Sequence, residues 1–337
     1  MATLEDFKKP YVSVIITAHN RKNFLKDAIN SVLNQALDRS FYEIIVVKNF
    51  DDHEIDNQIE ENKIIKFKAR DDSFIGEDLA IGIENAKGEI ISFLDDDDVF
   101  LPYKLTNIIK EFVRDPKLIY YKNNMKIIDK NANVIYKTKI HTIKNSIEMD
   151  LSLPKLDFKK IYNTHAKNNF NLSCLSIRKF YFTKYIDDLR MINGSSDGFF
   201  AITSMLSLYK IKFDNKILNL YRLHFILSSH STNSKDNIDN IIRETNKVRR
   251  SIQIFIKLSK DTPIQLYVKK EMLYWNIRLA IFDNSYHIKI KDLLLYIFNG
   301  GLSPISSRFL IVGSFFISKI NIALLFKLRV LFKIETI

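Results

Sequence analysis

The stretch GEIISFLDDDDVFLPYKL, residues 88–105, decides the fold and points to the site. Its first part, Glu89 to Leu94, is a short apolar run rich in isoleucine, which predicts a strand buried on both faces. Four consecutive carboxylates, Asp95 to Asp98, follow it directly. In sheets of parallel strands, ligands bind beyond the carboxyl ends of the strands. The sequence therefore places crowded negative charge where a ligand would bind.

Four adjacent carboxylates repel one another and are poor formers of helix or strand. A divalent cation offsets that repulsion. Mg²⁺ or Mn²⁺ takes hard oxygen ligands, usually one or two carboxylates together with substrate phosphates. A solvated acidic loop is the alternative for an arbitrary acidic run, but the position directly after a buried strand favours a metal site.

The chain before this stretch alternates between strands and helices. Apolar runs rich in Ile and Val predict strands at 11–18, 43–47 and 63–67, and helical spacing predicts helices over 24–33 and 79–86. This alternation predicts an α/β fold with a mostly parallel, twisted sheet flanked by helices.

Beyond Pro102 the pattern is less regular. A helix is expected through about Arg114, followed by strands and by a hairpin whose turn is Asp129 to Asn133. Residues 139–170 are polar and irregular, and they predict a loop over the site. From about residue 236 the spacing is helical, and SSHSTNSK, residues 228–235, is the expected boundary. We therefore expect a catalytic domain at 1–232 and a helical C-terminal region at 233–337.

Composition sets broad limits on the protein class. The chain has 337 residues, of which 46% are hydrophobic, so it can bury the core of one catalytic domain with an appendage. Its single cysteine, Cys174, cannot form an intramolecular disulfide and is expected to be a buried apolar residue, which favours a reducing compartment. Met1 to Pro10 lacks the apolar core of a signal peptide, so a cytoplasmic location is expected.

A net charge of +12 is compatible with nucleic acid, a membrane surface or an anionic substrate. The basic residues are spread among acidic ones, without a zinc finger or a long basic run, so no nucleic-acid partner is expected. The last apolar stretch, residues 308–334, is interrupted by Lys319 and is too short for a spanning helix. With Lys327, Arg329 and Lys333 it suits a helix on anionic lipid at the cytoplasmic face, or a core or homodimer-interface helix.

Residues 88–105 resemble the G-E-x-I-x-F-L-D-x-D-D-x-x-x-P-x-K-L signature of family 2 glycosyltransferases. VSVIITAHNR at 12–21, the strand at 43–47 and a DG segment at Asp197 extend the resemblance over about the first 230 residues. It implies the GT-A type fold of nucleotide-diphospho-sugar transferases. It also implies a metal-dependent, hexosyltransferase-type activity that moves a sugar, with inversion, from a nucleotide-diphosphate donor to an acceptor hydroxyl in a glycan, glycolipid or polysaccharide.

The resemblance also implies roles for single residues. Asp97 would be the direct metal ligand together with Asp95, while Asp95 or Asp96 would hold the ribose or metal-bound waters. The remaining donor-binding positions would be Thr17 and His19 at the end of the first strand, and Arg70 near the diphosphate.

One departure from the family concerns the nucleotide base. Relatives carry an acidic pair after the second strand that reads uracil, whereas this chain has Lys48 and Asn49. Asn49 could still present both a donor and an acceptor to a base edge, and Lys48 is expected to point to solvent. A UDP-sugar remains the favoured donor, and the acceptor is expected to be a glycan or a lipid-linked sugar.

The acceptor hydroxyl needs a base to take its proton during the attack. Asp197, in NGSSDGFFAI, resembles the position that carries this base in the family, although Ser196 replaces the usual preceding acid. Asp197 as a helix cap is the alternative. Relatives often carry R-x-H near the end of the catalytic domain, so His224 could reach the metal, with His230 as the alternative.

Two other functions stay open at this stage. A nucleotidyltransferase acting on sugar phosphates also uses a sheet and a carboxylate-bound metal, but it would need a Gly-rich phosphate loop near the first strand. A noncatalytic binding or scaffold protein that retains the fold is favoured by Lys48, Asn49 and Ser196. The acidic run and Asp197 oppose it.

Overall fold

The computed structural model describes residues 9–136, 142–168, 171–223, 235–299 and 305–320. The chain divides into two compact units. The first comprises Met1–Asp157, Thr164–Ile192 and Ser196–His224, and the second comprises Phe158–Asn163, Asn193–Ser195 and Phe225–Ile337. Most of the boundary expected at 228–235 lies outside the described residues, so it stays a prediction.

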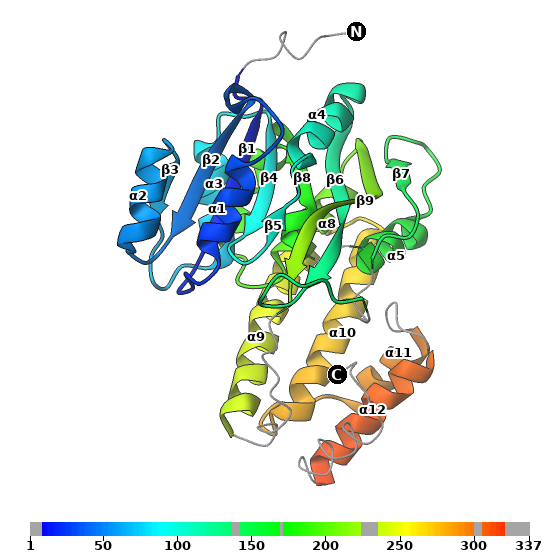
Figure 1. Ribbon diagram of the computed structural model, residues 1–337. Helices are drawn as coiled ribbons and strands as arrows, with labels where there is room; N and C mark the ends of the chain where they lie inside the picture. The colour runs from blue at the N-terminus through cyan, green and yellow to red at the C-terminus, as the bar shows by residue number, and fades with distance from the viewer. Residues whose placement is uncertain (1–8, 137–141, 169–170, 224–234, 300–304, 321–337) are drawn as a thin grey trace. The chain divides into compact units, whose positions relative to one another are not determined.

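A mixed sheet forms the centre of the first unit (Figure 1). Its strand order is β3-β2-β1-β4-β8-β6-β9-β5, and β7 pairs with β9. The strands are β1 (Val12–Ala18), β2 (Tyr42–Lys48), β3 (Ile65–Lys68), β4 (Ile90–Asp95), β5 (Val99–Phe100), β6 (Leu118–Ile128), β7 (Ile147–Asp150), β8 (Leu175–Arg178) and β9 (Lys210–Arg222).

The predicted parallel sheet is confirmed for β3, β2, β1 and β4, which all run in the same direction. Beyond β4 the sheet is mixed, because β8 is antiparallel to both of its neighbours, whereas β6 and β9 are parallel. The central strand β1 ends between β2 and β4, and its Thr17 pairs with Val47 on one side and with Asp95 on the other. The carboxyl ends of three strands therefore meet at one edge.

Helices cover both faces of this parallel part. The helices between β1 and β9 are α1 (Leu25–Leu33), α2 (His53–Glu61), α3 (Ile75–Asn85), α4 (Lys104–Arg114), α5 (Phe158–Asn168), α6 (Lys179–Phe182), α7 (Ile186–Arg190) and α8 (Ser196–Met205), of which α5 begins in the second unit. In Figure 1, α1 lies in front of the sheet and α3 behind it. Ile15 faces α3 so closely that a Cβ added at Gly82 would lie 2.6 Å from the Ile15 side chain. Glycine at this position lets α3 approach the sheet.

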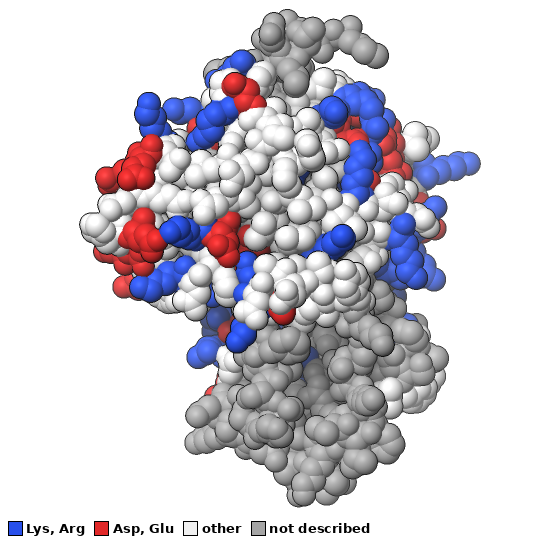
Figure 2. Space-filling view, in the orientation of Figure 1, with Lys and Arg blue, Asp and Glu red and all other residues white. Residues whose placement is uncertain are grey.

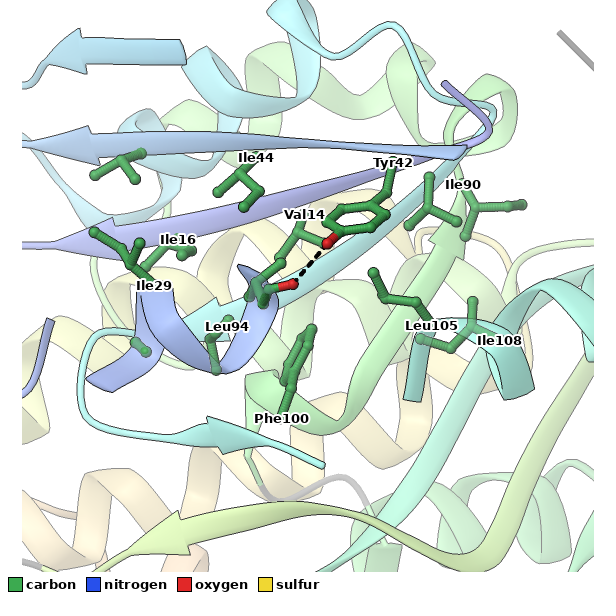
Figure 3. Packing of buried hydrophobic residues seen from close by; sticks show 14 of the residues in the cluster. Val14, Ile16, Ile29, Tyr42, Ile44, Ile90, Leu94, Phe100, Leu105 and Ile108 are labelled. Atoms are coloured by element: carbon green, nitrogen blue, oxygen red, sulfur yellow. Dashed lines mark hydrogen bonds between the residues drawn. The ribbon is translucent and has the colours of Figure 1, made fainter. Parts of the chain in front are cut away.

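The main core lies between the sheet and the helices α1 and α4 (Figure 3). Alternate residues of β1, among them Val14 and Ile16, pack there against Ile29 of α1 and Ile108 of α4. Tyr42 joins this core with its ring, and its hydroxyl donates to the Val32 carbonyl oxygen at 3.0 Å. The core fixes the strand ends that carry the site.

Two expectations about the middle of the chain have different outcomes. The turn at Asp129–Asn133 is confirmed, because the Asp129 N–H donates to the Asn133 carbonyl oxygen at 2.9 Å. The loop expected over 139–170 is wrong, because this stretch contains β7 and α5. The helix was not predicted because α5 is rich in lysine and asparagine and has only a short apolar stripe, in which Ile161 and Tyr162 are buried.

The second unit is helical, as expected for the C-terminal region. Its helices are α9 (Lys235–Leu258), α10 (Ile264–Phe282), α11 (Ile290–Asn299) and α12 (Ile305–Ile320). α10, α11 and α12 share a core that includes Ile281, Tyr296 and Val312. In the described part of the chain, we find no helix with the length and apolarity needed to cross a bilayer. Lys327, Arg329 and Lys333 lie outside the described residues.

Candidate active site

The four aspartates at the end of β4 form a buried turn, called here the acidic turn (Asp95–Asp98). The Asp98 N–H donates to the Asp95 carbonyl oxygen at 3.3 Å, which closes the turn. Asp96, Asp97 and Asp98 are 4%, 7% and 0% exposed. A solvated acidic loop, the alternative raised by the sequence, is therefore wrong.

Arg21, in the loop after β1, contacts two of these aspartates. Its Nε lies 3.0 Å from Oδ2 of Asp96, its Nη2 bonds the other oxygen of that carboxylate, and the same Nη2 lies 2.6 Å from Oδ2 of Asp97. Burial raises the pKa of Asp96, although its bonds with Arg21 oppose that shift. The guanidinium thus offsets much of the charge repulsion within the turn.

The other two aspartates are held by neutral groups. Asp98 accepts hydrogen bonds from Asn171 Nδ2 at 2.8 Å and from the Arg222 N–H at 2.9 Å. Ser173 Oγ lies 3.3 Å from Oδ2 of Asp95. Burial, with the charge of Asp97 next, raises the pKa of Asp98 to about 6. Burial also raises the pKa of Asp95, and the charges of the other three aspartates add to this shift.

Two buried lysines hold the segment that carries these neutral groups. The ammonium of Lys122 donates to the Asn171 carbonyl oxygen at 2.6 Å, and that of Lys104 donates to the Ser173 carbonyl and to Oδ1 of Asn219, the latter at 2.7 Å. Burial lowers the pKa of Lys104 to about 7 and also lowers the pKa of Lys122. Both lysines support the acidic turn from the interior.

A second polar group lies beyond the ends of β1, β2 and β3, and we call it the amide cluster (His19, Asn20, Asn49 and Asp71). Asn49 Oδ1 accepts from the Asn20 N–H at 2.8 Å, and Asn49 Nδ2 donates to Asn20 Oδ1 at 2.9 Å. Asn20 has a φ of 55°, a left-handed conformation that asparagine tolerates well. His19 Nε2 lies 3.2 Å from the Asp71 carbonyl oxygen and 3.5 Å from Asn49 Nδ2.

His19 also faces a buried carboxylate of α3. Its Nδ1 lies 3.6 Å from Oδ2 of Asp78, whose side chain is 1% exposed. Burial raises the pKa of Asp78, although the Ser73 hydroxyl and His19 oppose that shift. Asp78 was not singled out from the sequence, where it reads as an ordinary first-turn acid of a helix.

The other donor-binding candidates differ in burial. Thr17 is buried beside Asp95 in the sheet. Arg70 is exposed and bonds Oε2 of Glu77 at 3.1 Å. The expectation that Lys48 points to solvent is wrong, because it is 2% exposed and its ammonium pairs with Asp56 at 3.1 Å. Asp56, in the first turn of α2, supplies the partner that makes burial of this lysine possible.

Asp197 lies in the first turn of α8, and one oxygen accepts from the Gly198 N–H at 2.8 Å. The negative charges of Asp197 and Asp95 both act on the buried Lys122 and oppose the lowering of its pKa. The two carboxylates therefore share one electrostatic neighbourhood. His224 and His230 lie outside the described residues.

The acidic turn fits a divalent cation that the substrate helps to hold. Among the described residues, no group of three or more His, Cys, Asp and Glu side chains is arranged to hold an ion unaided. Mg²⁺ and Mn²⁺ commonly use one or two carboxylates together with substrate phosphates and water. Asp97 and Asp95 offer such hard oxygens at a strand end, and Arg21, next to them, has the fork geometry that suits phosphate.

The N-terminal part of the chain is similar in sequence to one enzyme family. The Glycosyl transferase family 2 profile matches residues 13–186, just over half of the chain. Uncharacterized glycosyltransferases from Rickettsia bellii and Rickettsia prowazekii are 25% and 26% identical over 221 and 226 residues, covering 64% and 65% of this chain. A relative from a Nostoc species is 36% identical over 132 residues, covering 37% of this chain.

The matches span 30%, 66% and 39% of the lengths of these three relatives, less than two thirds in each. Among solved structures, S. aureus TarS 1-349 in complex with UDP has a TM-score of 0.53 at 15% identity, over 85% of this chain and 78% of that one. The same protein in complex with UDP-GlcNAc gives 0.51 at 14% identity, over 90% and 89%. At this identity the likeness concerns the fold.

Proposed function

Because the chain belongs to glycosyl transferase family 2, we propose that it moves a sugar, with inversion, from a nucleotide-diphosphate donor to an acceptor hydroxyl. It is a glycosyltransferase, and its fold is of the GT-A type that the sequence predicts. The observation that carries the finer proposal is the acidic turn, three of whose four aspartates are buried at the end of a central strand.

In this proposal the acidic turn binds the donor diphosphate through a divalent cation. Asp97 and Asp95 supply its protein oxygens, and when bound the cation stabilises the charge that develops on the departing nucleotide. Arg70 is a further candidate for the diphosphate. Because it is exposed and pairs with Glu77, it would have to leave that partner to reach the donor.

The amide cluster is proposed as the base-binding side. Asn49 and His19 carry both donor and acceptor groups at the ends of β1 and β2, and Thr17 lies between them and Asp95. Asn49 is 5% exposed and its amide bonds Asn20, so it would have to give up those bonds to reach a base. The edge of uracil has a carbonyl oxygen that accepts a hydrogen bond and an N–H that donates one. A side-chain amide can bond both, because it has a donor and an acceptor. The titles of the TarS structures name UDP and UDP-GlcNAc, and this supports a UDP-sugar as the first donor to test.

Asp197 is proposed as the base that takes the proton of the acceptor hydroxyl. It is partly exposed, and its charge shares the neighbourhood of Asp95. Its bond to the Gly198 N–H is compatible with the capping role, and both roles can coexist. We keep a glycan or lipid-linked sugar as the proposed acceptor. His224 stays a candidate for the metal.

The proposal is tested by thermal unfolding in the presence of UDP, GDP, CDP and dTDP sugars, each with and without Mn²⁺. A ligand that binds only the folded state raises its stability with the logarithm of ligand concentration. We expect one nucleotide sugar to raise the melting temperature with Mn²⁺ and much less without it. If none does so at millimolar concentration, the proposal that this chain uses one of these nucleotide sugars with a divalent cation is wrong.

We also propose that the second unit contacts the cytoplasmic membrane face or a second copy, and we favour the membrane. Phe298 of α11 and Phe309 and Phe316 of α12 are 66%, 53% and 54% exposed. Flotation with anionic vesicles tests this, using a double variant, Phe298→Ser with Phe309→Ser. Tyr136→Ser, which removes an aromatic ring that is 90% exposed in the first unit, is the control. The wild type and the control should float, and the double variant should float less. Equal flotation of all three proteins, or flotation of none, would exclude a membrane contact through these phenylalanines.

A further inference from the structure

Arg21 has a role that the family signature does not describe. We propose that its guanidinium occupies the cation position of the acidic turn in the donor-free enzyme, leaves Asp97 when a divalent cation binds, and then pairs with the donor diphosphate. This inference rests on the proposed function. Its basis is that Arg21 Nη2 lies 2.6 Å from Oδ2 of Asp97, the carboxylate proposed to bind the metal.

The pairing is expected from the burial of the turn. Asp96 and Asp97 are only 4% and 7% exposed, and buried carboxylates without a counter-charge are costly. Arg222 also contacts the turn, but its guanidinium Nε bonds the Asp97 carbonyl oxygen and its Nη2 pairs with Asp27 at 3.2 Å. Arg21 bonds the carboxylates themselves, where a metal ion would bind.

Arg21 has more freedom to change conformation than the carboxylates that it contacts. Its side chain is 43% exposed and comes from the loop between β1 and α1. The aspartates belong to a turn that is closed by its own backbone and joined directly to β4. Breaking its bonds with the carboxylates has a cost, which the incoming cation offsets by taking over their charge. A long, partly exposed side chain changes rotamer more easily than a turn joined to a buried strand, so the guanidinium is the partner that leaves.

Where the freed guanidinium goes follows from charge. A cation at Asp97 would repel Arg21, while a diphosphate bound to that cation offers new oxygens in bidentate geometry. Metal and diphosphate should therefore bind cooperatively, each raising the affinity for the other by the same factor. Metal alone has to displace Arg21 without this compensation and should bind weakly.

The test measures free Mn²⁺ by electron paramagnetic resonance during titration of the full-length protein, first without nucleotide. Arg21→Gln should bind Mn²⁺ about tenfold more tightly than the wild type, because a charge-assisted bond no longer competes. At saturating Mn²⁺, the same variant should bind UDP about tenfold more weakly. The control is Lys22→Gln, which removes an ammonium that pairs with Asp52 at 3.1 Å. This variant should match the wild type in both measurements.

Unchanged or weaker Mn²⁺ binding by Arg21→Gln would overturn the inference, and so would a failure of both proteins to bind Mn²⁺. Arg21→Lys keeps the charge without the fork and should be intermediate, which preserves the test if the glutamine variant does not fold. The proposed function fails separately, if the wild type binds no nucleotide diphosphate with Mn²⁺ present. Should it bind UDP with Mn²⁺ while Arg21→Gln gains no Mn²⁺ affinity, only the role of Arg21 is wrong.

Discussion

The acidic turn and the amide cluster end neighbouring strands of one sheet but differ in chemistry. In the acidic turn, buried carboxylates are opposed by the guanidinium of Arg21 and by donors from Asn171 and Ser173. In the amide cluster, Asn20 and Asn49 bond each other reciprocally. Thr17, one residue from the end of β1, lies between the two.

This difference indicates a division of labour along one edge. Burying like charges costs free energy unless a cation binds them, so the acidic turn is suited to a metal ion and to phosphates. The amides of Asn20 and Asn49 carry paired donors and acceptors without net charge, so this part of the amide cluster is suited to the hydrogen-bonding pattern of a base edge. On the surface seen in Figure 2, by contrast, the central area of the first unit is mostly uncharged, with acidic and basic residues around it. Because the acidic turn and the amide cluster differ in chemistry, substitutions in them should affect different kinetic constants.

The largest effect is expected for Asp197→Asn. Removing a general base typically slows the chemical step by about 10²- to 10⁴-fold, and we expect kcat to fall about 10³-fold with little change in donor KM. Asp187→Asn is the matched control, because it removes an exposed first-turn carboxylate of α7. Steady-state kinetics with the donor found in the thermal screen provides the measurement. Full activity of Asp197→Asn would leave this residue as a helix cap.

A smaller loss of turnover, about 10²-fold, is expected for Asp97→Asn, because leaving-group stabilisation is weakened but not abolished. Its half-saturating Mn²⁺ concentration should rise as well. Asp51→Asn, which removes a carboxylate that is 79% exposed and pairs with Lys68, should behave as the wild type. An unchanged Mn²⁺ requirement in Asp97→Asn would move the metal site away from the acidic turn.

Lys104 gives the acidic side a distinct dependence on pH. Its pKa is about 7 in the fold and has an ordinary value of 10.5, so between these values the unfolded chain binds one more proton. The stability that Lys104 contributes therefore rises with pH across this window and is lost as pH falls through about 7. The free energy of unfolding of the wild type relative to Lys104→Met should rise by about 1.4 kcal/mol per pH unit between about pH 7 and 10.

Urea denaturation of both proteins across this range provides the measurement. The hydrogen bonds that the methionine variant loses at Ser173 and Asn219 add an offset that does not depend on that titration. Parallel stability curves for the two proteins would show that Lys104 keeps an ordinary pKa.

The smallest effect is expected on the amide side. Asn49→Ala removes hydrogen bonds to the base and should raise donor KM by about three- to tenfold, with kcat nearly unchanged. Asn57→Ala, an exposed amide of α2, is the control. A fall in kcat that equals the change for Asp97→Asn would mean that the two groups do not divide the work.

The sequence predicted the parts of the site that are continuous in the chain. The acidic turn follows β4 within residues 88–105, and the local alternation of apolar runs and helical spacing identified the parallel strands. Arg21 was missed because its partner Asp96 lies 75 residues away, and nothing local marks such a pair. The buried Lys48 was missed for a related reason, since only the packing of α2 beside β2 brings Asp56 to its ammonium.

The direct test is anomalous diffraction at the manganese edge from crystals soaked with Mn²⁺ and UDP. The account predicts a single strong peak about 2.1 Å from a carboxylate oxygen of Asp97 and in contact with the diphosphate, with Arg21 turned from Asp97 to the phosphates. A nucleotide bound elsewhere, or a bound nucleotide without manganese while Arg21 still pairs with Asp97, would contradict it.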